Sequence, residues 1–129
     1  DIEQFKSKKK FDIIIAFEVL EHIENWPKIL KKTNSLLKKN GILIISTINR
    51  NILSKILVIN IGENILRWIP KGTHQFEKLI KPQELEKQLK VNNFKVINFK
   101  GLKYNPLRDS WGFSDNLEIN YFCCSKKIN

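Results

Sequence analysis

Two isoleucine-rich apolar runs, FDIIIAF at Phe11–Phe17 and GILIIST at Gly41–Thr47, constrain the fold of this chain most strongly. Continuous apolar runs of this length are typical of strands that are buried on both faces, as in a parallel sheet. Between them, apolar residues recur at helical spacing over residues 26–37, after a candidate cap at Asn25 and with Pro27 in the first turn. The pattern predicts a strand–helix–strand unit with parallel strands.

The rest of the chain continues the alternation of helices and strands. Gly41 is expected to end the first helix in a left-handed conformation, and a second helix is expected to begin at Pro82. Strands are expected over residues 94–106 and 116–127, with only an irregular loop between them, and residues 51–72 form an amphipathic helical insert. We therefore predict an α/β fold: the second half of a doubly wound, Rossmann-like sheet that ends in an antiparallel hairpin. Such a half-sheet is expected to be the C-terminal part of a single domain whose first strands are missing.

Composition limits the classes of partner. The chain has 129 residues, enough for one domain, and a formal net charge of +10 that comes from 20 Lys and only 3 Arg. Because Lys, Ile and Asn all have A/T-rich codons, and because Arg, which reads phosphates and bases, is scarce, we expect no nucleic-acid partner. The adjacent Cys123 and Cys124 would form a strained disulfide, which favours a reduced, cytoplasmic compartment.

Three polar residues, Glu18, Glu21 and His22, follow the first apolar run. Ligands of open α/β sheets sit at the carboxyl ends of the strands, and in a helical turn this spacing places all three side chains on one face. Two carboxylates and an imidazole suit Mg²⁺, Mn²⁺ or Zn²⁺. The alternative is that the two glutamates stabilise a helix N-terminus while His22 is solvated.

The stretches FDIIIAFEVLEHIENW and GILIISTINRN resemble class I S-adenosylmethionine (SAM) methyltransferases around their fourth and fifth strands. The stretches STINRN, WIPKGTHQFEKLIKPQEL and GLKYNP are similar to a narrower group, the ubiquinone-biosynthesis O-methyltransferases. The likeness runs from Phe11 to about Cys124. The Gly-rich loop and the acidic ribose-binding residue of that family are absent from this chain.

The resemblance implies methylation of a hydroxyl group on a polyprenylated, catechol-type phenol, at two steps of ubiquinone assembly. It implies SAM as cofactor with a contact at Phe17, and a divalent metal, Mg²⁺, held by Glu18, Glu21 and His22. A metal-bound phenol would lose its proton more readily and attack the aligned methyl group. Since two parts of the SAM site are absent, the chain alone is expected to bind SAM poorly and to be inactive.

His74 and three aromatic residues are further candidates. His74 follows Gly72 in a predicted loop and is either a catalytic general base, a substrate contact or a surface histidine bonded to local backbone. Trp68, Trp111 and Phe113 either line a pocket for a ring or lipid or pack in the core or in loops in the ordinary way.

The predicted insert has a one-sided apolar stripe and is too polar to span a bilayer. The stripe consists of Leu57, Val58, Ile61, Ile65 and Trp68. We expect it to bind the membrane surface, so that the protein is peripheral on the inner membrane (on the matrix side in a mitochondrion), within reach of a ubiquinone-biosynthesis complex. In the alternative, the stripe packs on the protein itself. The competing functions are a different class I small-molecule methyltransferase and a non-catalytic membrane-surface module.

Overall fold

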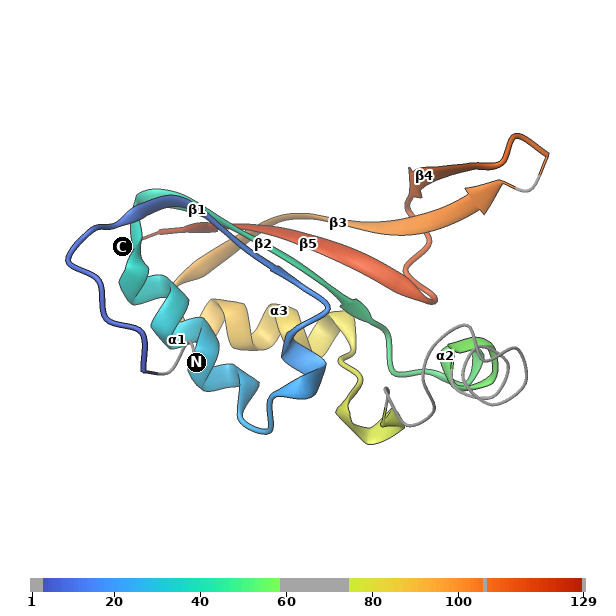
Figure 1. Cartoon of the computed structure of the whole chain (residues 1–129), viewed down its shortest axis with the longest axis horizontal. Helices are drawn as coiled ribbons and strands as arrows, with labels where there is room; N and C mark the ends of the chain where they lie inside the picture. Colours follow the sequence, from blue (N-terminus) through green and yellow to red (C-terminus); the bar gives the residue numbers. More distant parts are fainter. Residues whose placement is uncertain (1–3, 59–74, 106, 129) are drawn as a thin grey trace.

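The computed structural model describes residues 4–58, 75–105 and 107–128. These residues form a five-stranded sheet with two longer helices packed on one of its faces (Figure 1). The strands are β1 (Phe11–Phe17), β2 (Leu37–Ile48), β3 (Phe94–Asn105), β4 (Ser110–Ser114) and β5 (Asn120–Lys127). The α-helices are α1 (Trp26–Leu36), α2 (Ile52–Ser54) and α3 (Pro82–Val91), and the 3₁₀ turns are η1 (Leu20–His22) and η3 (Phe76–Lys78).

The strand order in the sheet is β1-β2-β5-β3-β4. β1 and β2 are parallel and are joined through α1, which confirms the predicted strand–helix–strand unit. β5 runs antiparallel to both of its neighbours, β2 and β3, and β4 pairs antiparallel with β3 at the edge. The predicted α/β class and the antiparallel pairing of the last strands are therefore confirmed.

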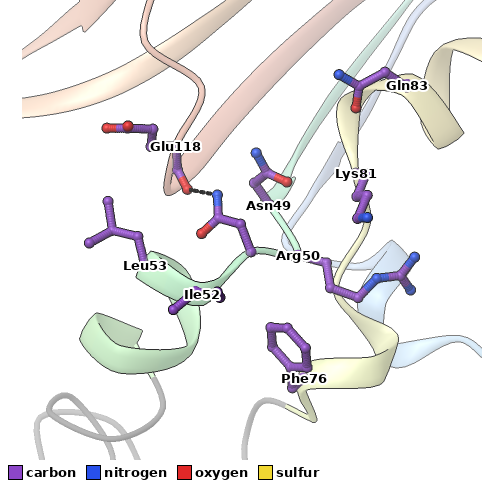
Figure 2. Close-up of a pocket in the computed structure, with 9 residues that line it drawn as sticks. Asn49, Arg50, Ile52, Leu53, Phe76, Lys81, Gln83 and Glu118 are labelled. Carbon is purple, nitrogen blue, oxygen red and sulfur yellow. Dashed lines mark hydrogen bonds between the residues drawn. The ribbon is translucent and has the colours of Figure 1, made fainter.

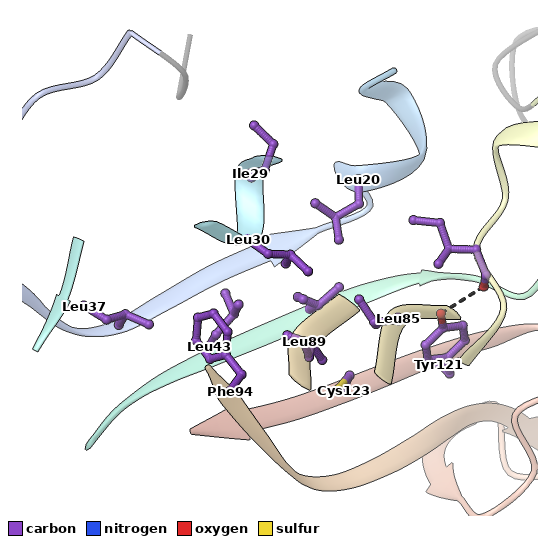
Figure 3. Packing of buried hydrophobic residues seen from close by; sticks show 12 residues of the cluster. Leu20, Ile29, Leu30, Leu37, Leu43, Leu85, Leu89, Phe94, Tyr121 and Cys123 are labelled. Atoms are coloured by element: carbon purple, nitrogen blue, oxygen red, sulfur yellow. Dashed lines mark hydrogen bonds between the residues drawn. The ribbon is translucent and has the colours of Figure 1, made fainter. Parts of the chain in front are cut away.

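The core lies between the sheet and the helices α1 and α3 (Figure 3). Leu85 and Leu89 are fully buried, as the spacing along the second helix predicts. The Tyr121 hydroxyl, also buried, donates a hydrogen bond to the Ile80 carbonyl oxygen at 2.9 Å and so satisfies its polar atom. The core consists of Leu20, Ile29, Leu30, Leu37, Leu43, Ile45, Ile80, Leu85, Leu89, Phe94, Tyr121 and Cys123.

The prediction that Gly41 ends the first helix is wrong. The helix ends at Leu36, and β2 begins at once with Leu37. The left-handed residue is Asn40 (φ 64°), inside a bulge where β2 gains residues relative to β1. Gly41 serves a different need, because a Cβ atom there would lie 3.1 Å from the Asp12 carbonyl oxygen. A side chain here would require its neighbours to shift by a few tenths of an ångström, so glycine suits the close approach of the two strands.

The predicted irregular loop between the last two strands contains a further strand, β4. Its central aromatic residues, Trp111 and Phe113, are 67% and 70% exposed, so they do not pack in the core. A five-residue edge strand with exposed side chains has no burial pattern that the sequence could reveal. The last strand also begins later than predicted, at Asn120.

Only the beginning of the predicted insert is described. Asn51 caps α2 by accepting a hydrogen bond from the Ser54 N–H at 2.8 Å, and residues 55–58 continue as a π-helical turn. Most of the apolar stripe, including Ile61, Ile65 and Trp68, lies outside the described residues. Across residues 4–58, 75–105 and 107–128, no helix combines the length and the apolar character that a membrane span needs.

The second face of the sheet carries apolar side chains but no helix from the described part of the chain (Figure 1). On β1, Ile14 and Ala16 pack against the core, whereas Ile13 and Ile15, on the opposite face, are 55% and 56% exposed. Pairing across the sheet brings further apolar residues onto the same face. We call this surface the open face and define it by Ile13, Ile15, Phe17, Ile42, Ile44 and Phe122.

Candidate active site

Glu18 is fixed at the carboxyl ends of β1 and β2. It leaves β1 in a left-handed conformation (φ 49°), and its backbone N–H donates to the Ser46 carbonyl oxygen at 3.0 Å and to Ser46 Oγ at 3.2 Å. Ser46 Oγ in turn donates to Glu18 Oε1 at 2.9 Å. Because Ser46 on β2 is the pairing partner of Phe17 on β1, these bonds hold the carboxylate beside the ends of both strands.

Glu21 lies in the 3₁₀ turn η1 and is only 3% exposed. Its Oε2 atom accepts a hydrogen bond from Thr47 Oγ1 at 2.9 Å, and Thr47 is itself fully buried. Its Oε1 atom is buried and has no hydrogen-bond partner among the residues that the structure describes. Since an unpaired buried carboxyl oxygen costs free energy, this atom is a candidate contact for a ligand or a proton.

The environment of Glu21 raises its pKa from 4.5 to about 7. Burial is the main cause, and the negative charge of Glu18 adds to it, whereas hydrogen bonds from the backbone and from Thr47 act in the opposite direction. A carboxyl group with a pKa near neutrality can both accept and release a proton. The two glutamates are therefore a candidate acid–base pair.

The three predicted metal ligands do not come together as a set. In the described part of the chain, no group of three or more His, Cys, Asp and Glu side chains could hold a metal ion. The prediction assumed an α-helical turn from Glu18, but the turn is a 3₁₀ helix over Leu20–His22. Glu18 lies before this turn, in a left-handed conformation, and His22 at the end of the turn is exposed. The two carboxylates and the unpaired Oε1 fit an Mg²⁺ ion that keeps water ligands, but a three-residue site is not formed.

The alternative role of the glutamates, stabilisation of a helix N-terminus, applies to Glu21, which lies in the first turn of η1, but neither glutamate lies at the start of α1. α1 begins at Trp26 after Asn25, and no side chain of the cap residue makes a capping hydrogen bond. No acidic residue lies in the first turn of α1. The glutamates thus interact with β2 and with each other.

Phe17, the predicted SAM contact, ends β1 and is 51% exposed. Its ring meets Phe122 edge-on, with centroids 5.6 Å apart, and Phe113 meets the same Phe122 ring in the same manner, also at 5.6 Å. Exposed aromatic rings at the end of a strand offer stacking surface to a planar ligand. The other predicted site residue, His74, lies outside the described residues.

A cleft of about 680 Å³ opens beyond the end of β2 (Figure 2). Arg50 and Lys81 bring positive charge to it, and Phe76 and Ile52 bring apolar surface. Asn51 Nδ2 donates to the Glu118 carbonyl oxygen at 2.6 Å and ties the start of the insert to the loop before β5. The cleft therefore lies where the end of β2, the start of the insert and the loop before β5 meet.

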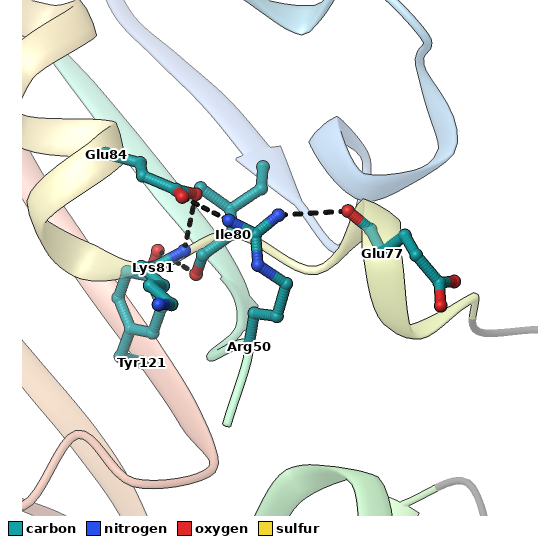
Figure 4. A network of polar contacts seen from close by, with 6 residues as sticks. All are labelled: Arg50, Glu77, Ile80, Lys81, Glu84 and Tyr121. Atoms are coloured by element: carbon teal, nitrogen blue, oxygen red, sulfur yellow. Dashed lines mark hydrogen bonds and ion pairs between the residues drawn. The ribbon is translucent and has the colours of Figure 1, made fainter. Parts of the chain in front are cut away.

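Arg50 organises this region and was not singled out from the sequence (Figure 4). Its guanidinium group donates to the Glu77 carbonyl oxygen at 3.0 Å and forms an ion pair with Glu84, whose other carboxyl oxygen accepts from the Lys81 N–H at 3.2 Å. The sequence did contain a signal for this role. Arginine is scarce, with 3 in the chain, and Arg50 closely follows a predicted strand, where its guanidinium group can form two hydrogen bonds at once.

A family model described as a methyltransferase domain matches residues 1–98. The ubiquinone biosynthesis O-methyltransferase of Bartonella bacilliformis is 44% identical over 120 residues, which are 93% of this chain and 48% of that protein. The chain thus spans about half the length of the curated relatives that it matches.

Solved structures of SAM-dependent methyltransferases have the same fold. A possible histamine N-methyltransferase from Thermotoga maritima is similar with a TM-score of 0.67 at 15% identity, over 98% of this chain and 60% of that one. The N-methyltransferase NodS from Bradyrhizobium japonicum, solved with S-adenosyl-L-homocysteine, matches with a TM-score of 0.59 at 15% identity, over 100% and 52% of the two chains. The fold is that of the class I methyltransferases, and the chain belongs to the methyltransferase domain family.

Proposed function

We propose that this chain contributes the acceptor side of a SAM-dependent O-methyltransferase that methylates a hydroxyl group of a polyprenylated, catechol-type ring in ubiquinone biosynthesis. The observation that carries the proposal is the similarity of 93% of the chain to a ubiquinone biosynthesis O-methyltransferase at 44% identity. The paired glutamates at the strand ends supply proton-transfer chemistry that suits such a reaction. Neighbours with this fold that hold S-adenosyl-L-homocysteine support SAM as the methyl donor.

Methyl transfer from a sulfonium to a phenol requires alignment and removal of one proton. The oxygen attacks the methyl carbon in line while the carbon–sulfur bond breaks and its electron pair remains on sulfur. Glu18 and Glu21, held by Ser46 and Thr47, are placed to take the hydroxyl proton, and His74 is a second candidate base. Phe17 offers its exposed ring to the cofactor or to the acceptor ring.

A divalent cation, Mg²⁺, would be held by Glu18 and Glu21, with its remaining positions taken by water or by substrate oxygen. Such an ion would lower the pKa of a bound phenol. Calorimetric titration of the protein with Mg²⁺ tests this part: binding that is lost in Glu21→Gln and kept in His22→Gln fits a two-carboxylate site. Loss of Mg²⁺ binding in both variants would instead support the three-residue metal site, Glu18, Glu21 and His22, that the resemblance implies.

The insert is proposed to place the protein on the inner membrane, where polyprenylated substrates and a ubiquinone-biosynthesis complex reside. Its described start supports this, because Ile52, Leu53 and Ile56 are exposed apolar residues beside Lys55. The double change Ile61→Ser with Ile65→Ser should abolish co-sedimentation with vesicles of anionic phospholipid while the fold survives. Loss of the fold would assign the stripe to the protein's own interior.

A fusion protein tests the reaction. The unmatched part of the Bartonella bacilliformis relative is joined to this chain and expressed in bacteria that lack their own ubiquinone biosynthesis O-methyltransferase. We expect ubiquinone to return with the wild-type chain and not with Glu18→Gln, whereas Glu24→Gln, an exposed glutamate nearby, should have no effect. Transfer of labelled methyl groups from SAM to other small acceptors, without ubiquinone, would favour a different class I methyltransferase. Membrane binding without any transfer would favour the non-catalytic module.

A further inference from the structure

The hairpin of β3 and β4 borders a second cavity. The hairpin projects beyond α1 and α3 (Figure 1), and the cavity, of about 660 Å³, lies between it and the loop that leads from β4 to β5. Tyr104 and Trp111 form part of the cavity wall, with their ring centroids 5.1 Å apart. The apolar lining residues are Leu102, Tyr104, Trp111 and Ile119. A cavity of this size suits a small organic ligand or part of a larger one.

Several polar side chains around the cavity already have hydrogen-bond partners. Asn116 Nδ2 donates to Glu118 Oε2 at 2.7 Å, and Asn116 Oδ1 accepts from the Glu118 N–H at 2.7 Å. Ser114 Oγ accepts from the Asn116 N–H at 3.2 Å. The Tyr104 hydroxyl donates to Asp109 Oδ1 at 2.6 Å. Because these polar atoms are bonded within the protein, the surface that remains for a ligand is mainly that of the rings and aliphatic side chains.

The cavity lies at the same end of the sheet as the two glutamates. Asn120, on the cavity wall, pairs with Ile48 at the end of β2. This pair lies two residues beyond Ser46, which holds Glu18. Two strand spacings and a step of two residues along a strand place Asn120 about 12 Å from Glu18. A ring whose hydroxyl group reacts beside Glu18 does not span this distance, whereas a tail attached to that ring can reach the cavity.

We propose that this cavity binds the apolar tail of the acceptor while the acceptor ring lies beside Glu18 and Glu21. The proposal rests on the proposed function, which supplies an acceptor with a polyprenyl tail. A branched hydrocarbon is stabilised by leaving water and by close contact with rings and aliphatic side chains. We call the cavity the tail pocket and define it by Leu102, Tyr104, Trp111 and Ile119.

The cleft at the end of β2 is a poorer match for a hydrocarbon tail. Arg50, Lys81 and Glu118 line it, and a tail placed against charged groups removes water from them without offering a new partner. The Phe76 ring of the cleft also faces the Lys55 ammonium group, 5.1 Å from the ring centroid. Phe76 nevertheless provides a direct test of this alternative.

Tail binding is measured by calorimetric titration of the purified chain with geraniol, a prenyl alcohol of two isoprene units that has no aromatic ring. We expect geraniol to bind, and Trp111→Ala to weaken that binding about tenfold because a large apolar contact is lost. Trp111→Phe keeps a ring in the wall and should lose less.

Phe113→Ala is the matched control. Phe113 lies on the same strand as Trp111 and is similarly exposed, at 70% against 67%, but its ring contacts Phe122 of the open face and does not line the tail pocket. Phe113→Ala and Phe76→Ala should both bind geraniol as the wild type does. Circular dichroism confirms that each variant remains folded.

Kinetics of the fusion protein described above test the same pocket during turnover, with catechol and a geranyl-substituted catechol as acceptors. Trp111→Ala should raise KM for the geranylated acceptor about tenfold and leave kcat unchanged, because the pocket binds the tail equally in the ground state and the transition state. KM for catechol itself should stay the same.

Three outcomes would overturn the tail pocket: no geraniol binding, binding that survives Trp111→Ala, or binding that is lost in Phe76→Ala. If geraniol binds through Trp111 but the fusion protein methylates neither catechol, the proposed reaction is refuted and the tail pocket stands. If the fusion protein methylates both acceptors and Trp111→Ala changes neither KM, the reaction stands and the tail pocket is wrong.

Discussion

Two consecutive hydroxyl residues on β2 each hold a different carboxylate of the candidate site. Ser46 and Thr47 point to opposite faces of the strand, as neighbours in a strand do, and Ser46 donates to Glu18 while Thr47 donates to Glu21. Two neighbouring residues of β2 thus hold both carboxyl groups in place through hydrogen bonds. The Thr47 contact is the more consequential, because Thr47 is the side-chain donor to Glu21 Oε2, and Oε1 of the same buried carboxyl group has no hydrogen-bond partner among the described residues.

Thr47→Val should remove that donor while keeping the shape of the side chain. Because the buried carboxyl group of Glu21 would then lose its side-chain donor, we expect the free energy of unfolding to fall by about 1–3 kcal/mol. Urea denaturation at pH 8, where Glu21 is charged, should show the larger loss, and pH 5 the smaller. Thr47→Ser retains the hydroxyl group and should lose less. Equal losses in the two variants would show that the methyl group, not the hydrogen bond, matters.

The raised pKa of Glu21 predicts the pH dependence of stability. Between pH 4.5 and about 7, the native state holds a proton on Glu21 that the unfolded chain has released, so the free energy of unfolding should fall as pH rises through this interval. The total fall attributable to Glu21 is about 3 kcal/mol, and above pH 7 it contributes no further slope. Urea denaturation across this range, with EDTA present to remove metal ions, measures the fall.

Glu21→Gln should flatten the curve, since glutamine does not titrate. Glu24→Gln, at an exposed site in the same segment, should keep the wild-type slope. A slope that persists in Glu21→Gln would assign the pH dependence to other groups.

At the scale of elements, the close approach of β3 and the loop before β5 depends on one glycine. Gly101 is buried in β3, and a Cβ atom there would overlap the Asn116 backbone carbonyl. That loop also carries Glu118, which lines the cleft at the end of β2. The position of the cleft wall therefore depends on the absence of a side chain in β3.

Gly101→Ala should displace this loop and destabilise the protein by about 1–3 kcal/mol, the usual cost of overpacking. Gly112→Ala is the matched control, because nothing lies within 4 Å of the added Cβ atom in the neighbouring strand β4. Thermal denaturation by circular dichroism compares the two. A neutral Gly101→Ala would show that the loop can move without cost.

The elements show what the sequence could and could not predict. Apolar periodicity located β1, β2, α1 and α3, because their side chains are buried in regular patterns. It did not locate β4, whose aromatic side chains are exposed, or the bulge at Asn40, which depends on the register of β1 against β2. The sequence spacing predicted that Glu18 and Glu21 lie close together, but it could not predict the left-handed conformation of Glu18 or the 3₁₀ turn that leaves His22 outside the pair.

At the scale of the whole molecule, long-range pairing holds the sheet together. β5 pairs with β2 on one side and with β3 on the other, while β4 pairs only with β3 among the described strands and meets β5 through the Phe113 and Phe122 rings. Hydrogen exchange should reflect this order: amides of Asn120–Lys127 should exchange only on global unfolding, and those of Ser110–Ser114 by local opening. Mass spectrometry of exchanged peptides checks the ranking. Equal protection of the two segments would mean that β4 is stabilised by contacts beyond β3.

The central place of β5 also bears on how the chain is made. Of the described strands it is translated last, yet β3 and β4 have no other route to β2. During synthesis, the ribosome must therefore release residues as far as Lys127 before the two halves of the sheet can meet. A stop codon within the last strand would leave a chain that cannot close its sheet, and quality-control proteases should remove it as they remove a much shorter one.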